Sequence, residues 1–260
     1  MLYIAKLVVI GVVTILAALL TILIGLFDPY GKHVYRITRF WTWMILALGR
    51  VSLKVKGLSR IDPNQQYIFM ANHQSNLDIP VLVQSLTTFQ LRWIAKQELL
   101  RVPFFGWAMW ASKHITVARG NRLDALSSLR KAQESITAGI SVVVFPEGTR
   151  SAHGALLPFK KGGFLLATQT GTPVVPLTIN GSGALLPAGA WRLRPGTIEI
   201  VIADPIAVES YRPGNLRMLS ERVRTAIAAH LRDPSPSTSE SPRLMTKSVG
   251  RNYLCRGREQ

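Results

Sequence analysis

The sequence predicts one α/β domain whose sheet is largely parallel and flanked by helices, with a pair of membrane-anchoring helices before it and a disordered basic tail behind it. Two observations predict this organisation. Short apolar, β-branched runs alternate with helical patterns through the middle of the chain, as in sheets built from crossover connections. A long uncharged segment precedes them, and a segment rich in Ser and Pro follows. We therefore expect three parts, residues 1–49, 50–232 and 233–260.

A segment long enough to cross a bilayer lies near the amino terminus. Leu7–Phe27 holds twenty-one residues without a charge, and about twenty apolar residues span the hydrocarbon core as a helix. A secretory signal peptide has a shorter apolar core and a small-residue cleavage site, and a surface helix of a soluble domain has a polar face. The segment therefore predicts a membrane helix, with a signal peptide as the alternative.

Basic and aromatic residues follow the apolar segment. Between Pro29 and Ile61 there are seven basic residues and no acid, namely Lys32, Arg36, Arg39, Arg50, Lys54, Lys56 and Arg60. Each is worth on the order of 1 kcal/mol near an anionic lipid surface. Phe40–Gly49, which contains two Trp, is too short to span and predicts an interfacial or re-entrant helix. Because the positive charge follows the first helix, we expect the domain on the cytoplasmic side of the inner membrane.

Seven short runs in the middle region have the length and composition of strands. They are Val51–Lys56, Tyr67–Ala71, Leu91–Ala95, Ile115–Ala118, Val142–Phe145, Val174–Ile179 and Ile198–Ile202. Two helices with apolar stripes are predicted among them, one from a cap at Asn121 to a stop at Gly139 and one over about Asn215–Arg232. Both stripes indicate ordinary core packing, and roughly 180 residues are enough for one core.

Residues 233–260 begin with Asp-Pro-Ser-Pro-Ser-Thr-Ser-Glu-Ser-Pro and continue with scattered basic residues. A segment with so few apolar side chains cannot bury enough surface to fold. We expect a disordered tail, either solvated or held at the membrane by its basic side chains.

The overall composition indicates a membrane-associated protein. The chain has 31 basic and 14 acidic residues, a net charge of +17, a pI near 10.8 and a mean hydropathy of +0.21. A nucleic-acid binder can be as basic, but the excess is not gathered on a recognisable helix-turn-helix, RRM or zinc module. We therefore expect membrane lipids as partners and no nucleic acid.

Several common active sites are missing from the sequence. The single cysteine, Cys255, excludes an intrachain disulfide and lies in the tail, where a thiol nucleophile would have no scaffold. No Gly-x-Ser-x-Gly, His-Glu-x-x-His or Gly-x4-Gly-Lys-Ser/Thr motif occurs. His33, His114, His153 and His230 are widely spaced, so we expect surface or packing histidines and no metal.

A histidine and a carboxylate stand five positions apart directly after one predicted strand. In the segment Asn-His-Gln-Ser-Asn-Leu-Asp that starts at Asn72, His73 can take a proton from an alcohol near neutral pH, and Asp78 can hold the other ring nitrogen. The spacing suits a strand that ends, turns at Asn72 and starts a helix carrying Asp78 on its first turns. Taken alone, the pair is equally typical of a surface or core histidine beside a chance acid.

A second polar segment, Phe145–Ser151 (Phe-Pro-Glu-Gly-Thr-Arg-Ser), follows another β-branched strand. Loops at strand ends are where rigid scaffolds present reactive groups. Arg150 supplies a fixed cation, and Gly148 lets backbone N–H groups approach an anion. These features favour a phosphate site, and the alternative is an ordinary polar turn with a surface Glu/Arg pair.

The two segments together resemble the sequence blocks of the glycerolipid acyltransferase family, and within it those of the 1-acyl-sn-glycerol-3-phosphate acyltransferases. The family carries an apolar stretch ending in arginine between them, which matches Ile115–Asn121. After them it carries a Phe-Lys-x-Gly stretch and an apolar segment with a proline, which match Phe159–Gly162 and Val174–Ile179. The resemblance runs from about Val51 to about Ile206.

The resemblance implies an enzyme of phospholipid biosynthesis that moves a fatty acyl group from acyl-CoA or acyl carrier protein to the sn-2 hydroxyl of lysophosphatidic acid, giving phosphatidic acid. His73 would be the general base and Asp78 its orienting acid, without a covalent acyl-enzyme or a cofactor. Arg119 and Arg150 would grip the glycerol phosphate, since a guanidinium binds phosphate through two hydrogen bonds. The other residues that the resemblance assigns are Glu147, Gly148, Thr149 and Lys160 for the acceptor, and Asn72 and Pro176 for structure or the donor side.

One departure from the family bears on the acceptor. Members often have an acid before the arginine of the middle block and a glycine a few residues earlier, where this chain has Ala118 and Ser112–His114. Another lysolipid, such as lyso-ornithine lipid, is therefore the alternative acceptor, and a non-catalytic lipid-binding module is the alternative class. Acyl-chain length would depend on an apolar tunnel, and Trp107, Met109 and Trp110 are candidates for its lining.

Overall fold

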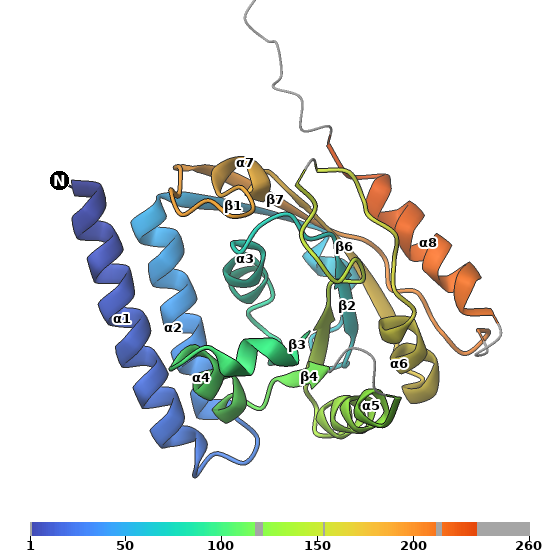
Figure 1. Ribbon diagram of the computed structural model, residues 1–260. Coiled ribbons are helices and arrows are strands. Elements are labelled where there is room, and N and C mark those ends of the chain that lie inside the picture. Colours follow the sequence, from blue (N-terminus) through green and yellow to red (C-terminus); the bar gives the residue numbers. More distant parts are fainter. Residues whose placement is uncertain (1, 118–121, 153, 212–214, 233–260) are drawn as a thin grey trace, which may run out of the picture.

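The chain forms a seven-stranded sheet with helices on both faces (Figure 1). The computed structural model describes residues 2–117, 122–152, 154–211 and 215–232. The strands are β1 (Val51–Lys56), β2 (Ile68–Ala71), β3 (Leu91–Lys96), β4 (Ile115–Val117), β5 (Ser141–Val144), β6 (Val174–Asn180) and β7 (Gly196–Ile202). The helices are α1 (Leu2–Gly25), α2 (Lys32–Gly49), α3 (Asp78–Ser85), α4 (Phe105–Ala111), α5 (Arg122–Thr137), α6 (Gly162–Thr170), α7 (Ser182–Leu185) and α8 (Leu216–Ala228), with short 3-10 turns at Leu58–Arg60 and Gln97–Arg101.

The sheet is largely parallel, which confirms the predicted fold class. The strand order is β1-β7-β6-β2-β5-β3-β4. Neighbouring strands run parallel except β6 and β7, which are antiparallel. Each of the seven predicted strands is present within two residues of its predicted bounds.

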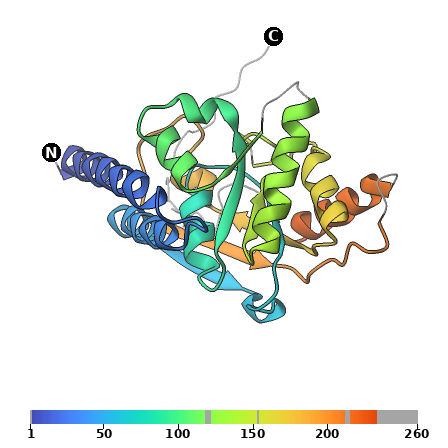
Figure 2. The same ribbon diagram turned by 90° about the horizontal axis from the view of Figure 1, so that it is seen from below.

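Two hydrophobic clusters lie on opposite faces of the sheet. Tyr67, Phe69 and Ala71 around β2 contribute to one cluster, together with side chains of α2 and α3. Ile68 and Met70 contribute to the other, together with α5, α6 and α8. Figures 1 and 2 show these two sets of helices on opposite sides of the sheet. A strand buried on both faces is a rigid support for whatever follows it.

The helix pair α1–α2 packs against the rest of the fold. Residues Ile4–Gly25 of α1 are long and apolar enough to cross a membrane, and only 11% of the most apolar window is buried inside the protein. Helix α1 contacts α2 and α4, and Trp41 Nε1 of α2 donates a hydrogen bond to Thr14 Oγ1 of α1 at 3.0 Å. Figure 2 shows α1 and α2 side by side at one end of the molecule.

Helix α2 begins eight residues before the predicted start at Phe40. The cause is a capping contact from outside the helix. Asp28 Oδ2 accepts hydrogen bonds from the backbone N–H groups of His33 and Val34, at 2.7 and 3.1 Å, which satisfies two donors of the first turn. Gly31, with φ +60°, makes the preceding turn.

Helix α8 ends at Ala228, four residues before the predicted end. The side chain of Asn180 binds the chain just beyond the helix: its Nδ2 donates to the carbonyl of His230 at 2.9 Å, and its Oδ1 accepts from the N–H of Arg232 at 2.9 Å. Tertiary hydrogen bonds thus replace helical ones. The predicted cap of α5 at Asn121 and the predicted tail, residues 233–260, lie outside the described residues.

Candidate active site

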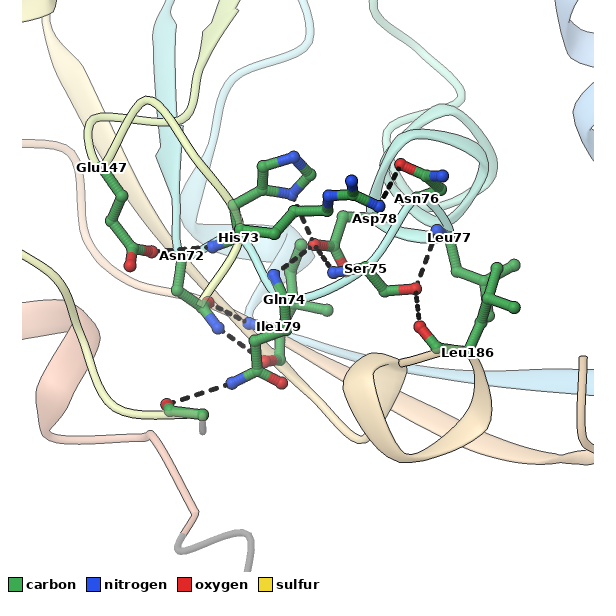
Figure 3. Close-up of polar contacts among 12 residues, drawn as sticks. Asn72, His73, Gln74, Ser75, Asn76, Leu77, Asp78, Glu147, Ile179 and Leu186 are labelled. Carbon is green, nitrogen blue, oxygen red and sulfur yellow. Dashed lines mark hydrogen bonds and ion pairs between the residues drawn. The ribbon is translucent and has the colours of Figure 1, made fainter. Parts of the chain in front are cut away.

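The two polar segments meet at one edge of the sheet. Strands β2 and β5 are parallel neighbours, so the loops that follow Ala71 and Val144 leave the sheet at the same edge. Segments separated by more than seventy residues in the sequence are thereby brought side by side (Figure 3).

His73 and Asp78 are in direct contact. Nδ1 of His73 lies 2.8 Å from Oδ2 of Asp78, the first residue of α3. The same carboxylate oxygen accepts hydrogen bonds from the backbone N–H groups of Gln74 and Ser75, at 2.8 and 2.9 Å. Asp78 is fully buried. With Nδ1–H donating to this carboxylate, the lone pair of His73 is on Nε2, where it can accept a proton.

The ring of His73 is held on one face as well as at Nδ1. It stacks on Phe145, with ring centroids 4.0 Å apart and an interplanar angle of 11°. The carbonyl of His73 accepts a hydrogen bond from the N–H of Ser151 at 2.8 Å. The imidazole is 16% exposed, so it is fixed in orientation and still reachable.

Glu147 joins the two loops behind the ring. Its Oε1 accepts a hydrogen bond from the backbone N–H of His73 at 2.8 Å, and its Oε2 accepts one from Leu157 at 2.9 Å. Burial raises the pKa of Glu147, against the opposing effect of these two hydrogen bonds and of the charge of His73. Both carboxylate oxygens are thus used by the backbone, which makes Glu147 a positioning residue for the loop that carries His73.

Asn72 and Pro176 lie in the scaffold. The Asn72 side chain is buried and bridges to β6, donating from Nδ2 to the carbonyl of Ile179 at 2.9 Å and accepting at Oδ1 from its N–H at 2.7 Å. Pro176 is buried within β6, where its carbonyl accepts a hydrogen bond from Ala203 at 3.0 Å. These contacts fix the strand ends from which the site loops leave.

Four of the predicted acceptor-binding residues face one cavity with His73. Gly148, Thr149, Arg150 and Lys160 all line it. Arg150 Nη1 donates to Asn76 Oδ1 at 3.0 Å, so the guanidinium is tied to the loop that carries the histidine. The second predicted arginine, Arg119, lies outside the described residues.

The cavity has a volume of about 1210 Å³. The site loops supply polar lining, and α1, α2 and α4 supply mostly apolar lining, including Ala18, Ile45 and Met109. Of the three side chains predicted to line an acyl tunnel, only Met109 is among the described residues that line this cavity. Trp107 and Trp110 are 53% and 58% exposed on the outer side of α4, so for them the prediction was wrong.

A second histidine, His114, also lines this cavity. Its ring stands edge-on to Trp93, with centroids 5.5 Å apart. Neither His114 Nδ1 nor Trp93 Nε1 has a hydrogen-bond partner among the described residues. Burial and the positive charge of Arg92 lower the pKa of His114 to about 3, so this ring is neutral at physiological pH.

Sequence reasoning assigned no role to several side chains that build the site. Phe145 stacks on His73, and Ser75 Oγ donates to the carbonyl of Leu186 at 2.7 Å while accepting from the N–H of Leu77 at 3.1 Å. Apart from Leu186, these residues lie inside the two polar segments, 72–78 and 145–151. Their residue types alone do not show which hydrogen-bond or stacking partners they have in the folded protein. Among the described residues, no group of three or more His, Cys, Asp or Glu could hold a metal ion.

Comparison with known proteins assigns a family to the chain that carries this site. The family model named Acyltransferase matches residues 52–180. A 1-acyl-sn-glycerol-3-phosphate acyltransferase from Pseudomonas aeruginosa is 33% identical over 208 residues, which are 80% of this chain and 79% of that protein. The human 1-acyl-sn-glycerol-3-phosphate acyltransferase alpha is 32% identical over 79% of this chain and 73% of its own length.

A solved structure agrees with these matches. The crystal structure of the 1-acyl-sn-glycerophosphate (LPA) acyltransferase PlsC from Thermotoga maritima superposes with a TM-score of 0.67 and 29% identity, covering 89% of this chain and 99% of that one. The chain therefore belongs to the acyltransferase family, and it is an enzyme.

Proposed function

We propose that this enzyme transfers a fatty acyl group from an acyl thioester to the sn-2 hydroxyl of lysophosphatidic acid, giving phosphatidic acid. The names of the relatives support this acceptor. The observation that carries the mechanism is the 2.8 Å contact between the buried Asp78 and Nδ1 of His73, which itself lines the cavity, because this contact leaves Nε2 for the substrate.

In the proposed reaction, His73 Nε2 takes the proton of the acceptor hydroxyl while the oxygen attacks the thioester carbonyl. Asp78 stabilises the imidazolium that forms. The tetrahedral intermediate then collapses with cleavage of the C–S bond, and the imidazolium returns its proton to the leaving thiolate. General-base assistance of this kind contributes about 10²- to 10⁴-fold, and positioning of the two substrates supplies much of the rest.

The phosphate of the acceptor would be held by the cationic lining of the cavity. Arg150 and Lys160 both face it, and Gly148, with φ +67°, brings backbone close to the same space. A guanidinium recognises phosphate through paired hydrogen bonds, and an ammonium acts as a point charge. Arg119 is proposed as a further phosphate ligand.

The acyl chain would occupy the apolar part of the cavity between the site loops and helices α1, α2 and α4. The thioester is proposed to come from acyl-CoA or acyl carrier protein, and the reaction as written needs no cofactor or metal. We further propose that residues 1–49 anchor the enzyme in the inner membrane and that residues 50–232 form the catalytic domain on the cytoplasmic face.

A panel of lysolipids tests the acceptor. Purified full-length enzyme is offered lysophosphatidic acid, lyso-ornithine lipid and other lysophospholipids, once with acyl-CoA and once with acyl carrier protein. We expect a wide preference for lysophosphatidic acid, and equal or better use of lyso-ornithine lipid would reassign the acceptor.

The role of His73 as general base is tested with the variant His73→Ala. The variant should lose about 10²- to 10⁴-fold in kcat with its thermal unfolding unchanged. Full activity of the folded variant would remove the general-base assignment without affecting the acceptor assignment.

A further inference from the structure

A second cavity lies apart from the active site. It is formed by the first turns of α1, the end of α2 and residues 192–195, and its volume is about 750 Å³. Ligand sites in proteins have volumes of about 300–1,000 Å³. Among the described residues, none lines both this groove and the active-site cavity.

The charges along this groove are all of one sign. Lys6, Arg50, Arg192 and Arg194 line it, and no acid is among the described residues that do so. Three of the four are arginines on the exposed surface. Guanidinium groups are suited to phosphate because they offer paired donors. The polar part of the groove therefore fits a phosphate ester.

The walls between these cations are apolar. Leu7 and Ile10 of α1 line the groove together with Leu48 and Leu193. On the same helix, Ile4 and Val8 are 66% and 59% exposed. An inorganic phosphate or a nucleic acid would contact only the basic side chains of the groove, whereas a phospholipid would contact both the basic side chains and the apolar walls.

The groove is built by fixed contacts. Leu193 packs so closely on Gly49 that a Cβ at position 49 would collide with its Cδ2. The N–H of Arg194 donates to the carbonyl of Leu185 at 2.9 Å, and Lys6 Nζ donates to the carbonyl of Leu48 at 3.0 Å. The segment that carries two of the arginines is thus tied to the ends of α2 and α7.

We propose that this groove binds one anionic phospholipid, with its phosphate on Arg50, Arg192 and Arg194 and an acyl chain along Leu7 and the outer face of α1. The groove ends one helical turn of α1 from the active-site cavity, because Ile10 lines the groove and Thr14 lines the cavity. A lipid held here would therefore seat the enzyme with its cavity next to the lipid phase.

The proposal is tested by lipid retention. Full-length protein in detergent is mixed with phosphatidylglycerol and phosphatidylcholine and analysed by native mass spectrometry. We expect one retained phosphatidylglycerol. The double variant R192Q/R194Q should bind it about 25-fold more weakly, since each basic side chain is worth about 1 kcal/mol, or about fivefold. The matched control K131Q/R217Q removes two exposed charges from α5 and α8, on the other side of the sheet, and should retain the lipid.

Two further variants separate a built site from diffuse attraction. Leu7→Trp keeps all four cations and fills the groove, so it should lose the retained lipid. Arg150→Gln, in the proposed acceptor site, should keep it, which distinguishes this groove from the active site. Retention in Leu7→Trp, or equal losses in R192Q/R194Q and K131Q/R217Q, would overturn the proposal. Thermal unfolding of each variant establishes that it is folded.

Discussion

His73 and His114 line the same cavity from two regions of the molecule, and their neighbours give them opposite properties. His73 stands in a loop at the sheet edge, with a carboxylate 2.8 Å from Nδ1. His114 stands before β4, next to the edge of Trp93 and near the cation of Arg92, and its Nδ1 has no partner among the described residues.

The comparison shows that a histidine is made useful by the groups that surround it. A carboxylate on one nitrogen fixes the tautomer and stabilises the protonated ring, so the other nitrogen can cycle a proton. Burial beside a cation does the reverse, since it disfavours the protonated ring altogether. The loop region is therefore suited to proton transfer, and the wall that holds His114 is suited to packing.

The largest effect is expected from Asp78→Asn. This variant removes the carboxylate beside Nδ1 of His73, and His114 has no such carboxylate. The amide oxygen of Asn can occupy the position of Oδ2, where the three hydrogen bonds to Asp78 converge. The substitution then removes the negative charge at position 78 and keeps the geometry of these three hydrogen bonds. We expect kcat to fall by about 10²- to 10⁴-fold, as for loss of general-base catalysis, measured by thiol release with lysophosphatidic acid.

The same variant should unfold at nearly the wild-type temperature. A variant that folds normally and turns over at the wild-type rate would show that the carboxylate does not assist His73. The comparison between the two histidines would then lose its functional meaning.

A smaller effect is expected from Glu147→Gln, which perturbs the loop region without touching the ring. The two oxygens of Glu147 accept from two backbone N–H groups, and the amide NH₂ of Gln would face one of these donors. A buried donor left unpaired costs about 1–3 kcal/mol. We expect a lower thermal unfolding temperature and a smaller loss of kcat than in Asp78→Asn, because Asp78 still holds the ring.

The result for Glu147→Gln is read against Asp78→Asn as its matched control, since each removes one carboxylate near His73. A larger loss of rate in Glu147→Gln, with stability unchanged, would identify Glu147 as the partner that matters for proton transfer.

The sequence predicted the sheet well because its signal is local. Each strand is a short run of strand length that is mostly apolar or alternates apolar with polar residues, and all seven were found. The contact between His73 and Asp78 was also predictable, since both residues lie in one turn. The start of α2 was missed because it depends on Asp28, which reaches forward past a glycine turn to cap the helix.

Contacts between distant segments were beyond local patterns. The bond from Glu147 to the N–H of His73 exists because the sheet places β5 beside β2. The cavity wall depends on how α1 and α4 pack, which is why Trp107 and Trp110 could not be told from Met109. The basic groove brings together Lys6 and Arg194, which no sequence motif connects.

A pH-dependent effect is expected from His114→Gln. Below about pH 6.5 the unfolded chain protonates this histidine, whereas the folded protein keeps it neutral down to about pH 3. Because the unfolded state binds the extra proton, this histidine does not lower the free energy of unfolding above about pH 6.5. Between about pH 6.5 and about pH 3 the free energy of unfolding falls by about 1.4 kcal/mol for each pH unit. His114→Gln should lose this part of the acid sensitivity, seen as a smaller drop in unfolding temperature between neutral and mildly acidic buffer.

The variant should keep its activity at neutral pH, because the proposed reaction uses His73 and not His114 for proton transfer. An unchanged acid sensitivity would mean that the ring is accessible to protons in the folded protein. A large loss of kcat would show that His114 takes part in the reaction, and the contrast between a functional and a packing histidine would then be wrong.

The smallest effect is expected from Met109→Trp, which enlarges a side chain in the apolar wall. If the acyl chain lies between this wall and the site loops, the larger ring displaces the end of the chain and favours shorter donors. Each methylene that loses its apolar surroundings costs about 0.8 kcal/mol, or about fourfold in relative kcat/KM. Trp107→Phe, on the exposed side of the same helix, is the matched control and should leave the chain-length profile unchanged. A shift in the control but not in Met109→Trp would place the chain on the outer surface of α4, and the cavity wall that holds His114 would then have no part in selecting the donor.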